Sequence, residues 1–111
     1  MVIEYNLLDF LNANLSVPVY MEEPDTIIDS YIIIQKTGES RTDQINSATF
    51  AIQSYGKTKE NAIDLNESVK AVMDVMPQTQ DVFSCKLNSD YDYTDSETKR
   101  YRYQAVYVIT Y

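Results

Sequence analysis

Every odd position of residues 101–111 carries an aromatic or apolar side chain, and this period of two constrains the fold more than any other feature of the sequence. Neighbouring side chains of a β-strand point to opposite faces of a sheet, so every second residue shares a face. Residues 83–93 have the same period, and a polar stretch separates the two segments. The pattern predicts two strands that pair as a hairpin at the end of the chain. The odd positions of both strands are mostly aromatic or apolar. They include Phe83, Cys85, Leu87, Tyr91, Tyr93, Tyr101, Tyr103, Ala105, Tyr107, Ile109 and Tyr111.

One register of this hairpin places the large odd residues opposite each other along its length. Cross-strand aromatic pairs and opposite-charge pairs each stabilise a sheet by about 0.2–1 kcal/mol, so this register is the expected one. It pairs Phe83 with Tyr111, Cys85 with Ile109, Leu87 with Tyr107, Ser89 with Ala105, Tyr91 with Tyr103 and Tyr93 with Tyr101, and on the other face Asp92 with Arg102 and Asp90 with Gln104.

Val106 and Val108 lie on the even face of the last strand, away from the face that carries its tyrosines. Both faces of this strand are therefore apolar near its end. We expect each face to be covered, either by a helix or by a neighbouring subunit. The tyrosine stripe has a mainly structural interpretation, because an apolar ring with a polar hydroxyl suits a half-buried surface or the rim of an interface.

Two segments have the period of amphipathic helices. The first, residues 3–15, places on one face Leu7, Leu8, Leu11 and Leu15. The second, residues 57–76, places on one stripe Ala62, Leu65, Val69, Val72, Met73 and Met76. Thr58 is the expected N-cap of the second helix, and Pro77 is expected to end it near Met76.

Three further strands are expected between these helices. Pro18 disfavours helical backbone and cannot donate a hydrogen bond, so residues 17–23 predict a short edge strand. Residues 30–37 and 47–55 are rich in β-branched and aromatic side chains and predict a hairpin. The polar stretch Gly38–Asn46 between them predicts a long, flexible tip that reaches a partner or a lumen.

The elements therefore follow the order α-β-β-β-α-β-β within one domain, residues 1–111. Runs of strands with helices at intervals are typical of the α+β class. We expect a mostly antiparallel sheet with the two helices packed on it.

Most catalytic chemistry is absent from the sequence. The chain has no histidine, one cysteine and two glycines, which excludes histidine-based triads, most zinc sites and phosphate-binding glycine loops. The acidic group that begins at Asp90 does not fit a calcium loop, because Asp95 and Tyr101 stand where that loop needs glycine and glutamate. We expect no catalytic residue, no metal site and no cofactor. Cys85 is expected to be a small, buried strand residue.

The composition also bears on partners. A net charge of −8 argues against tight binding of nucleic acid, since that affinity comes from cations that neutralise phosphates. A tyrosine platform for single strands would need a basic groove, and the only dense basic cluster is Lys99, Arg100 and Arg102. No apolar run is long enough to span a membrane, and the N-terminus lacks the features of a signal peptide, so we expect synthesis in the cytoplasm and no membrane partner.

The whole chain resembles the tail terminator, or minor tail and head–tail joining, family of long-tailed bacteriophages and prophages. The resemblance runs through "LLDFLNANL", through "FAIQSYGKTKENAIDLNESVKAVM" and through the closing "YDYTDSETKRYRYQAVYVITY". It implies a small α+β subunit that forms a ring, typically of six copies, at the head-proximal end of the tail tube in the virion. The expected partners are other copies of the chain, the tail tube protein and the head connector, with DNA passing through an acidic lumen without sequence-specific binding.

Two alternatives remain open beside this reading. The first is another position in the same particle, as a head–tail connector, a stopper or another minor capsid protein. The second, of another class, is a small acidic adaptor that binds one host partner. The candidate residues for contact with another copy or a partner are Arg41, Asp43, Gln44, Asp92, Arg100, Arg102, Val106 and Val108.

Overall fold

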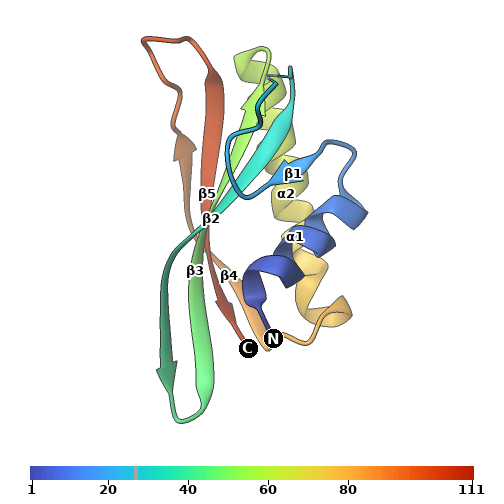
Figure 1. The fold of residues 1–111 in the computed structure, drawn as a ribbon, viewed down its shortest axis with the longest axis vertical. Coiled ribbons are helices and arrows are strands. Elements are labelled where there is room, and N and C mark those ends of the chain that lie inside the picture. The colour runs from blue at the N-terminus through green and yellow to red at the C-terminus, as the bar shows by residue number, and fades with distance from the viewer. Residues whose placement is uncertain (27) are drawn as a thin grey trace.

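The protein is an α+β fold, as predicted, in which two helices pack on a five-stranded sheet (Figure 1). The computed structural model describes residues 1–26 and 28–111. In chain order the elements are α1 (Ile3–Asn14), β1 (Val19–Tyr20), β2 (Tyr31–Thr42), β3 (Ile45–Gly56), α2 (Lys59–Thr79), β4 (Ser84–Asp92) and β5 (Tyr101–Thr110). The strand order in the sheet is β1-β2-β3-β5-β4, with β1 parallel to β2 and the other pairs antiparallel. The predicted order of elements is confirmed.

The helices and the helix-facing side of the sheet enclose the core. In Figure 1 both helices lie on the same side of the sheet. The predicted apolar stripes face inward: Leu7 and Leu11 of α1 and Val69, Met73 and Met76 of α2 are fully buried. The strands contribute alternate residues to this core, which are Val19, Ile32, Ile34, Ala48, Phe50, Ile52, Ala105, Tyr107 and Ile109.

The N-terminus of α2 fits tightly against the end of β3. Thr58 caps the helix as predicted, because its hydroxyl accepts a hydrogen bond of 3.1 Å from the backbone N–H of Asn61. At Gly56 a Cβ atom would lie only 2.5 Å from the backbone nitrogen of Ala62. A glycine is therefore needed here because the first turn of the helix approaches the strand so closely.

The prediction that Pro77 ends the second helix near Met76 was wrong. The helix continues to Thr79 with the proline inside its last turn. Proline removes its own N–H donor, but the N–H of Gln80 still bonds to the Met76 carbonyl over 2.9 Å. One missing hydrogen bond near the end of the helix did not stop the final turn.

The prediction of a long flexible tip over Gly38–Asn46 was also wrong. Strands β2 and β3 continue almost to its centre and are joined by only two residues, Asp43 and Gln44. Both have positive φ angles, 51° and 66°, as the tight turn of a two-residue hairpin requires. A polar hairpin arm has no apolar pattern, so these paired strands could not be predicted from hydrophobic periodicity.

The predicted register of the closing hairpin is correct in its first half only. Cys85 pairs with Ile109 and Leu87 with Tyr107, as predicted. A bulge between Leu87 and Ser89 then shifts β4 by one residue, so that Ser89 faces Val106 rather than Ala105. The other corrected pairs are Asp90–Ala105, Tyr91–Gln104 and Asp92–Tyr103.

The shift has a physical reason, because it moves two carboxylates to the helical side of the sheet. Asp90 lies 2.7 Å from the amine of Lys70, and Asp92 lies 3.2 Å from that of Lys59, both on α2. In the unbroken register these aspartates point away from the helices. The bulge therefore replaces the predicted tyrosine pairs of Tyr91 and Tyr93 with two ion pairs. It also places Tyr91 on the face of the sheet that points away from the helices.

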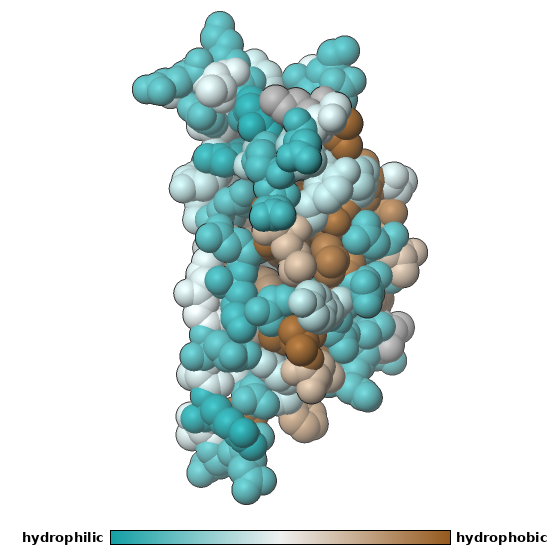
Figure 2. Space-filling view, in the orientation of Figure 1, coloured by the Kyte–Doolittle hydropathy of each residue, from teal (hydrophilic) through white to brown (hydrophobic). Residues whose placement is uncertain are grey.

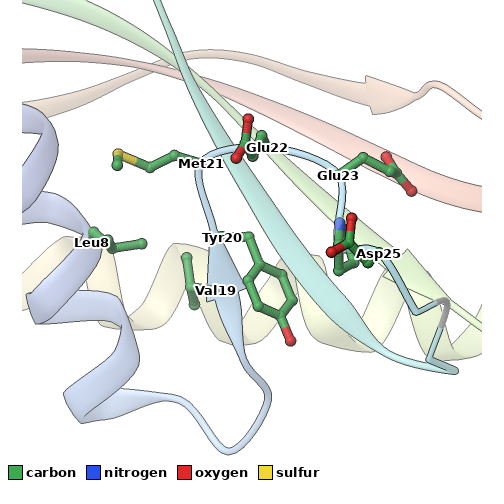
Figure 3. A pocket seen from close by; sticks show the side chains of 8 residues that line it. Leu8, Val19, Tyr20, Met21, Glu22, Glu23 and Asp25 are labelled. Atoms are coloured by element: carbon green, nitrogen blue, oxygen red, sulfur yellow. The ribbon is translucent and has the colours of Figure 1, made fainter.

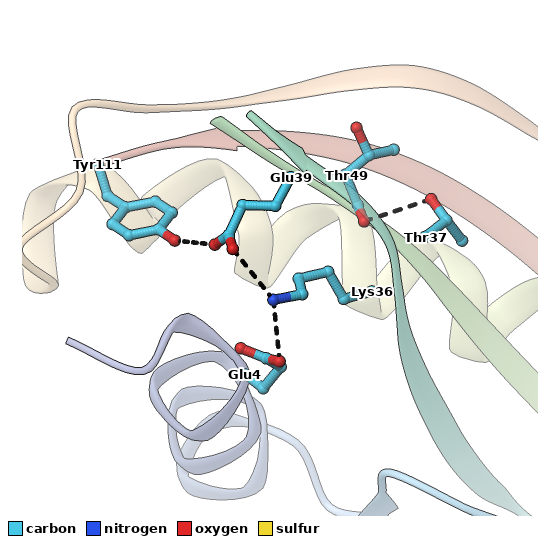
Figure 4. A network of polar contacts seen from close by, with 6 residues as sticks. All are labelled: Glu4, Lys36, Thr37, Glu39, Thr49 and Tyr111. Carbon is cyan, nitrogen blue, oxygen red and sulfur yellow. Dashed lines mark hydrogen bonds and ion pairs between the residues drawn. The ribbon is translucent and has the colours of Figure 1, made fainter. Parts of the chain in front are cut away.

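A polar network ties both ends of the chain to β2 (Figure 4). The Lys36 amine lies 3.1 Å from Glu4 of α1 and 3.3 Å from Glu39, and the Tyr111 hydroxyl donates a hydrogen bond to Glu39. The hydrogen bond to Glu4 is the main cause that raises the pKa of Lys36. Burial, followed by the contact with Glu39, raises the pKa of Tyr111 to about 12. The network holds α1 and the C-terminus beside the arm of the β2–β3 hairpin.

Candidate partner-binding surfaces

The helices leave one face of the sheet uncovered, and we call it the open face (Figure 1). Strand side chains alternate, so the residues between the core positions point to it. By strand they include Tyr20; Tyr31, Ile33 and Gln35; Ser47, Thr49, Ala51, Gln53 and Tyr55; Ser84, Lys86, Ser89 and Tyr91, with Tyr93 just beyond β4; and Arg102, Gln104, Val106, Val108 and Thr110.

Aromatic rings and arginines form one end of the open face. Tyr31 and Tyr55 are a cross-strand pair whose rings stack with centroids 4.6 Å apart. The guanidinium carbon of Arg102 lies 4.4 Å from the ring centroid of Tyr93 and 5.7 Å from that of Tyr55. Arg102 also donates to the Tyr55 hydroxyl over 2.8 Å. These contacts make a single row across β2, β3 and β5 that ends at Tyr93, just beyond β4.

Arg100 joins this row from the β4–β5 connection. Its guanidinium carbon lies 4.9 Å from the Tyr55 ring centroid, and it forms an ion pair with Glu23. Glu23 also accepts a hydrogen bond of 2.8 Å from the Tyr31 hydroxyl. The structure therefore brings together two predicted candidates, Arg100 and Arg102, which both contact Tyr55. A small cavity of 170 Å³ beside them is lined by Ile28, Asp29, Tyr31, Tyr55, Gly56, Lys57, Lys99, Arg100 and Tyr101.

The next row of the open face is a chain of polar side chains. The Gln53 amide donates to Gln104 over 2.9 Å, and the Gln104 amide donates to the Tyr91 hydroxyl over 2.5 Å. The Tyr55 hydroxyl donates to Gln53 over 3.3 Å. These bonds hold both amides flat against the sheet and satisfy them across three strands.

Small side chains form the middle of the open face. Ala51 and Val106 are cross-strand neighbours, and Thr49 faces Val108 in the adjacent row. Val106 and Val108 are half-buried, although no helix lies over them. The prediction that both faces of β5 are apolar near its end is thus confirmed at these positions, and the helices cover only one of them.

Charge separates the two sides of the molecule. None of the described strand residues on the open face is acidic, whereas it carries the cations Lys86 and Arg102. The chain as a whole has 17 acidic and 9 basic residues. Figure 2 shows brown apolar side chains gathered over the helical half of that view, with pale and teal side chains along the sheet.

The exposed side of α2 has the opposite character, and we call it the outer face of α2. Four carboxylates lie along it, and within the described residues it carries no lysine or arginine. Two exposed apolar side chains accompany them, Ile63 at 36% and Val75 at 42% of full exposure. The exposed residues of this face are Glu60, Asn61, Ile63, Asp64, Glu67, Ser68, Ala71, Asp74, Val75 and Gln78.

Both lateral edges of the sheet are also open. β4 forms one edge over its whole length. At the other edge β1 covers only Ile32 and Ile33, so the outer half of β2 has no strand beside it among the described residues. Each edge strand contains a bulge, between Lys36 and Gly38 or between Leu87 and Ser89, and bulges discourage simple edge pairing.

The remaining predicted residues lie apart from the open face. Arg41, Asp43 and Gln44 are at the end of the β2–β3 arm, at the opposite end of the sheet from Arg100 (Figure 1). Asp92 lies on the helical side, where hydrogen bonds from Thr94 and the ion pair with Lys59 lower its pKa. The eight candidates therefore do not form one site: four of them, Arg100, Arg102, Val106 and Val108, lie on or beside the open face.

Sequence reasoning missed most of the open face. Thr49, Ala51 and Gln53 alternate with the core residues of β3, and that period was the available signal. Their side chains are small or polar, so they were not recognised as a surface with a role. Lys86 lies in the correctly predicted half of the closing hairpin, opposite Val108, but a single lysine between core positions is no local signal of a partner surface.

A cavity of 540 Å³ lies between α1 and the segment after β1 (Figure 3). Its lining combines apolar and acidic side chains: Leu8, Val19, Tyr20, Met21, Glu22, Glu23, Pro24 and Asp25. One of its carboxylates, Glu23, is already engaged by Arg100 and Tyr31. The cavity does not contain a nucleophile with a neighbouring base.

Reactive groups are not gathered elsewhere in residues 1–26 and 28–111. No cluster of three or more acidic or cysteine side chains suited to a metal ion occurs in that part of the chain. Burial raises the pKa of the Cys85 thiol to about 11, which makes it a poor nucleophile near neutral pH. None of the described helices has the length and apolar character needed to cross a bilayer.

Comparison with models of known protein families found no match, and a search of curated proteins found none.

Proposed function

We propose that the chain is a structural assembly protein of a phage or prophage tail, which forms a ring at the end of the tail tube and joins it to the head. The proposal combines the resemblance of the sequence to tail terminators with the geometry of the open face. It assigns no bond-making or bond-breaking step to any residue.

The observation that carries the proposal is the uncovered position of Val106 and Val108. These valines lie side by side along β5, half-buried and without a helix above them. Half-exposed valines in the middle of a sheet face favour a surface that another polypeptide covers. A structural protein of an assembly would have its open face covered in the particle.

The charge distribution supports the same proposal. A head-to-tail ring uses two different patches on every subunit. The open face and the outer face of α2 differ in charge and lie on opposite sides of the sheet, so they are two such patches. An acidic lumen requires that the helical side faces the DNA, because none of the described strand residues on the open face is acidic.

A connector or stopper in the same particle is the second candidate, and the same open face favours it equally. A monomeric adaptor for a host partner is the third. In that case the Tyr91 and Tyr93 rings, 42% and 45% exposed at the edge of the open face, would contact the partner.

Electron microscopy of the purified chain, alone and mixed with tail tubes of the phage that encodes it, tests the proposal. We expect closed rings, and we expect them at the head-proximal end of the tubes. Rings at another position in the particle would favour the connector. A chain that stays monomeric with tail tubes present, and is absent from virions, would contradict the proposal.

A further inference from the structure

We infer that the open face binds the outer face of α2 of a second copy of this chain, in a head-to-tail contact. This inference rests on the proposed function, because it names the partner of the surface that the proposal leaves to be covered.

Opposite charge is the first argument for this pairing. The outer face of α2 carries the carboxylates of Glu60, Asp64, Glu67 and Asp74. The lysines of the same helix stand at its edge and are already paired: Lys59 with Asp92, and Lys70 with Glu67 and Asp90.

The cations of the open face are available to such a partner. Lys86 is exposed and forms no hydrogen bond or ion pair with another described residue. Arg102 is held by Tyr55 and by the Tyr93 carbonyl, and it has no ion pair within the described chain. The described strand residues of this face include two cations and no carboxylate, and the nearby Glu23 is already engaged by Arg100 and Tyr31. The face therefore attracts the acidic helix, and like-charge contacts are avoided.

Shape is the second argument. The centre of the open face carries small side chains, Ala51, Val106 and Val108, so a helix can approach the sheet closely there. The outer face of α2 offers Ala71 near its middle, with Ile63 and Val75 on either side of it. A helix of 21 residues is about 30 Å long, close to the length of a ten-residue strand such as β5. Packing it there would bury the valines and complete a helix layer on each side of the sheet.

Other copies fit the open face less well. Two open faces packed together would place the cations Lys86 and Arg102 of one copy against a face that carries the same cations and no acidic strand residue. Pairing through the edges of β4 and β2 leaves the valines uncovered and has to accommodate a bulge in each strand.

Disulfide cross-linking of the full chain tests the contact. Ala71→Cys and Val106→Cys are introduced together and singly in a Cys85→Ala background, and circular dichroism checks that each variant is folded. Under mild oxidation we expect the double variant to form a ladder of covalent dimers and higher species, while each single variant stays largely uncross-linked.

The other outcomes each overturn the inference. Covalent dimers of Val106→Cys alone would indicate a two-fold contact between open faces, and dimers of Ala71→Cys alone a two-fold contact between helices. If rings form but no variant cross-links, the ring uses another contact; the inference fails and the proposed function stands. A chain that does not assemble at all would contradict both the inference and the proposed function.

Charge reversal on α2 is an independent test of the contact. Asp64→Lys should raise the protein concentration at half-assembly about tenfold or more, because it places a cation opposite Lys86 or Arg102. Glu97→Lys makes the same change in net charge at the tip of the β4–β5 connection and should leave assembly unchanged. Equal effects of the two variants would mean that only net charge matters, and would contradict a specific contact at α2.

Discussion

The rings of Tyr31 and Tyr55 stack across neighbouring strands with their planes only 7° apart and their centroids 4.6 Å apart. Both side chains are almost fully buried, although they lie on the face of the sheet that no helix covers. The arginines Arg100 and Arg102 cover the Tyr55 ring in place of a helix. The open face therefore has its own small core at one end, whereas no helix or arginine covers its middle at Val106 and Val108.

The first prediction is that Tyr55→Ala destabilises the monomer strongly. Removing the ring leaves a cavity, ends the stack with Tyr31 and frees two arginines, so we expect a loss of about 3 kcal/mol in the free energy of unfolding. Urea denaturation followed by circular dichroism measures it. Tyr5→Ala is the matched control, because Tyr5 is 58% exposed and its loss should change stability by less than about 0.5 kcal/mol. Similar values for the two variants would show that the Tyr55 cluster contributes little.

The second prediction compares the two glycines of the chain. A Cβ at Gly56 meets the backbone of α2 at 2.5 Å, and backbone atoms cannot move aside cheaply. We expect Gly56→Ala to cost about 1–3 kcal/mol of stability. At Gly38 nothing lies within 4 Å of an added Cβ, so Gly38→Ala should be neutral or stabilise by up to about 1 kcal/mol. Thermal unfolding of both variants checks the order, and a Gly56→Ala protein as stable as the wild type would contradict the close approach.

The third prediction concerns the single thiol. Since burial raises the pKa of Cys85 to about 11, its thiolate fraction at pH 8 should be about 100-fold lower than in the unfolded chain. The rate of reaction with Ellman's reagent, measured with and without denaturing urea, should differ at least by that factor. Comparable rates in the two conditions would mean that Cys85 is accessible on the native sheet.

The fourth prediction is a loss of stability in acid. Hydrogen bonds lower the pKa values of three carboxyls: Tyr111 is the main donor to Glu39, Thr94 to Asp92, and the backbone of Glu97 to Asp95. A carboxyl with a lowered folded pKa stabilises the fold above its unfolded pKa, and that contribution disappears as pH falls through the folded value. The free energy of unfolding should therefore decrease as pH falls below about 4.

Asp92→Asn isolates one part of this acid effect. The variant keeps an oxygen that accepts from Thr94 but has no charge to lose, so its stability should depend less on pH in that range than the wild type's does. Urea titrations at several pH values between about 2 and 6 give the two slopes. Identical slopes would exclude Asp92 as a contributor.

The sequence predicted the elements whose side chains repeat, because periodic burial leaves a mark on composition. The stripe through Val69, Met73 and Met76 and the alternation through Ala105, Tyr107 and Ile109 both became core. The Thr58 cap followed from local chemistry that requires no partner in the fold.

What the sequence did not predict depends on contacts between distant residues. The bulge after Leu87 is favoured by ion pairs of Asp90 and Asp92 with lysines of α2, which no local pattern of β4 reports. The turn at Asp43 and Gln44 has no glycine, although both residues adopt positive φ. The open face was partly visible, because Val106 and Val108 indicated a second apolar surface. That the described strand residues of the open face are not acidic becomes clear only when β2, β3, β4 and β5 are placed side by side.

Light scattering of the wild type and of Val108→Asp, with and without tail tubes, tests most directly the claim that the open face is an assembly surface. Val108 is half-exposed, so the variant should keep the circular dichroism of the fold. We expect wild-type particles of several times the 12.8 kDa chain mass and a folded Val108→Asp monomer, with Glu97→Ala assembling like the wild type. A folded Val108→Asp chain that assembles and completes tails as the wild type does would contradict the account.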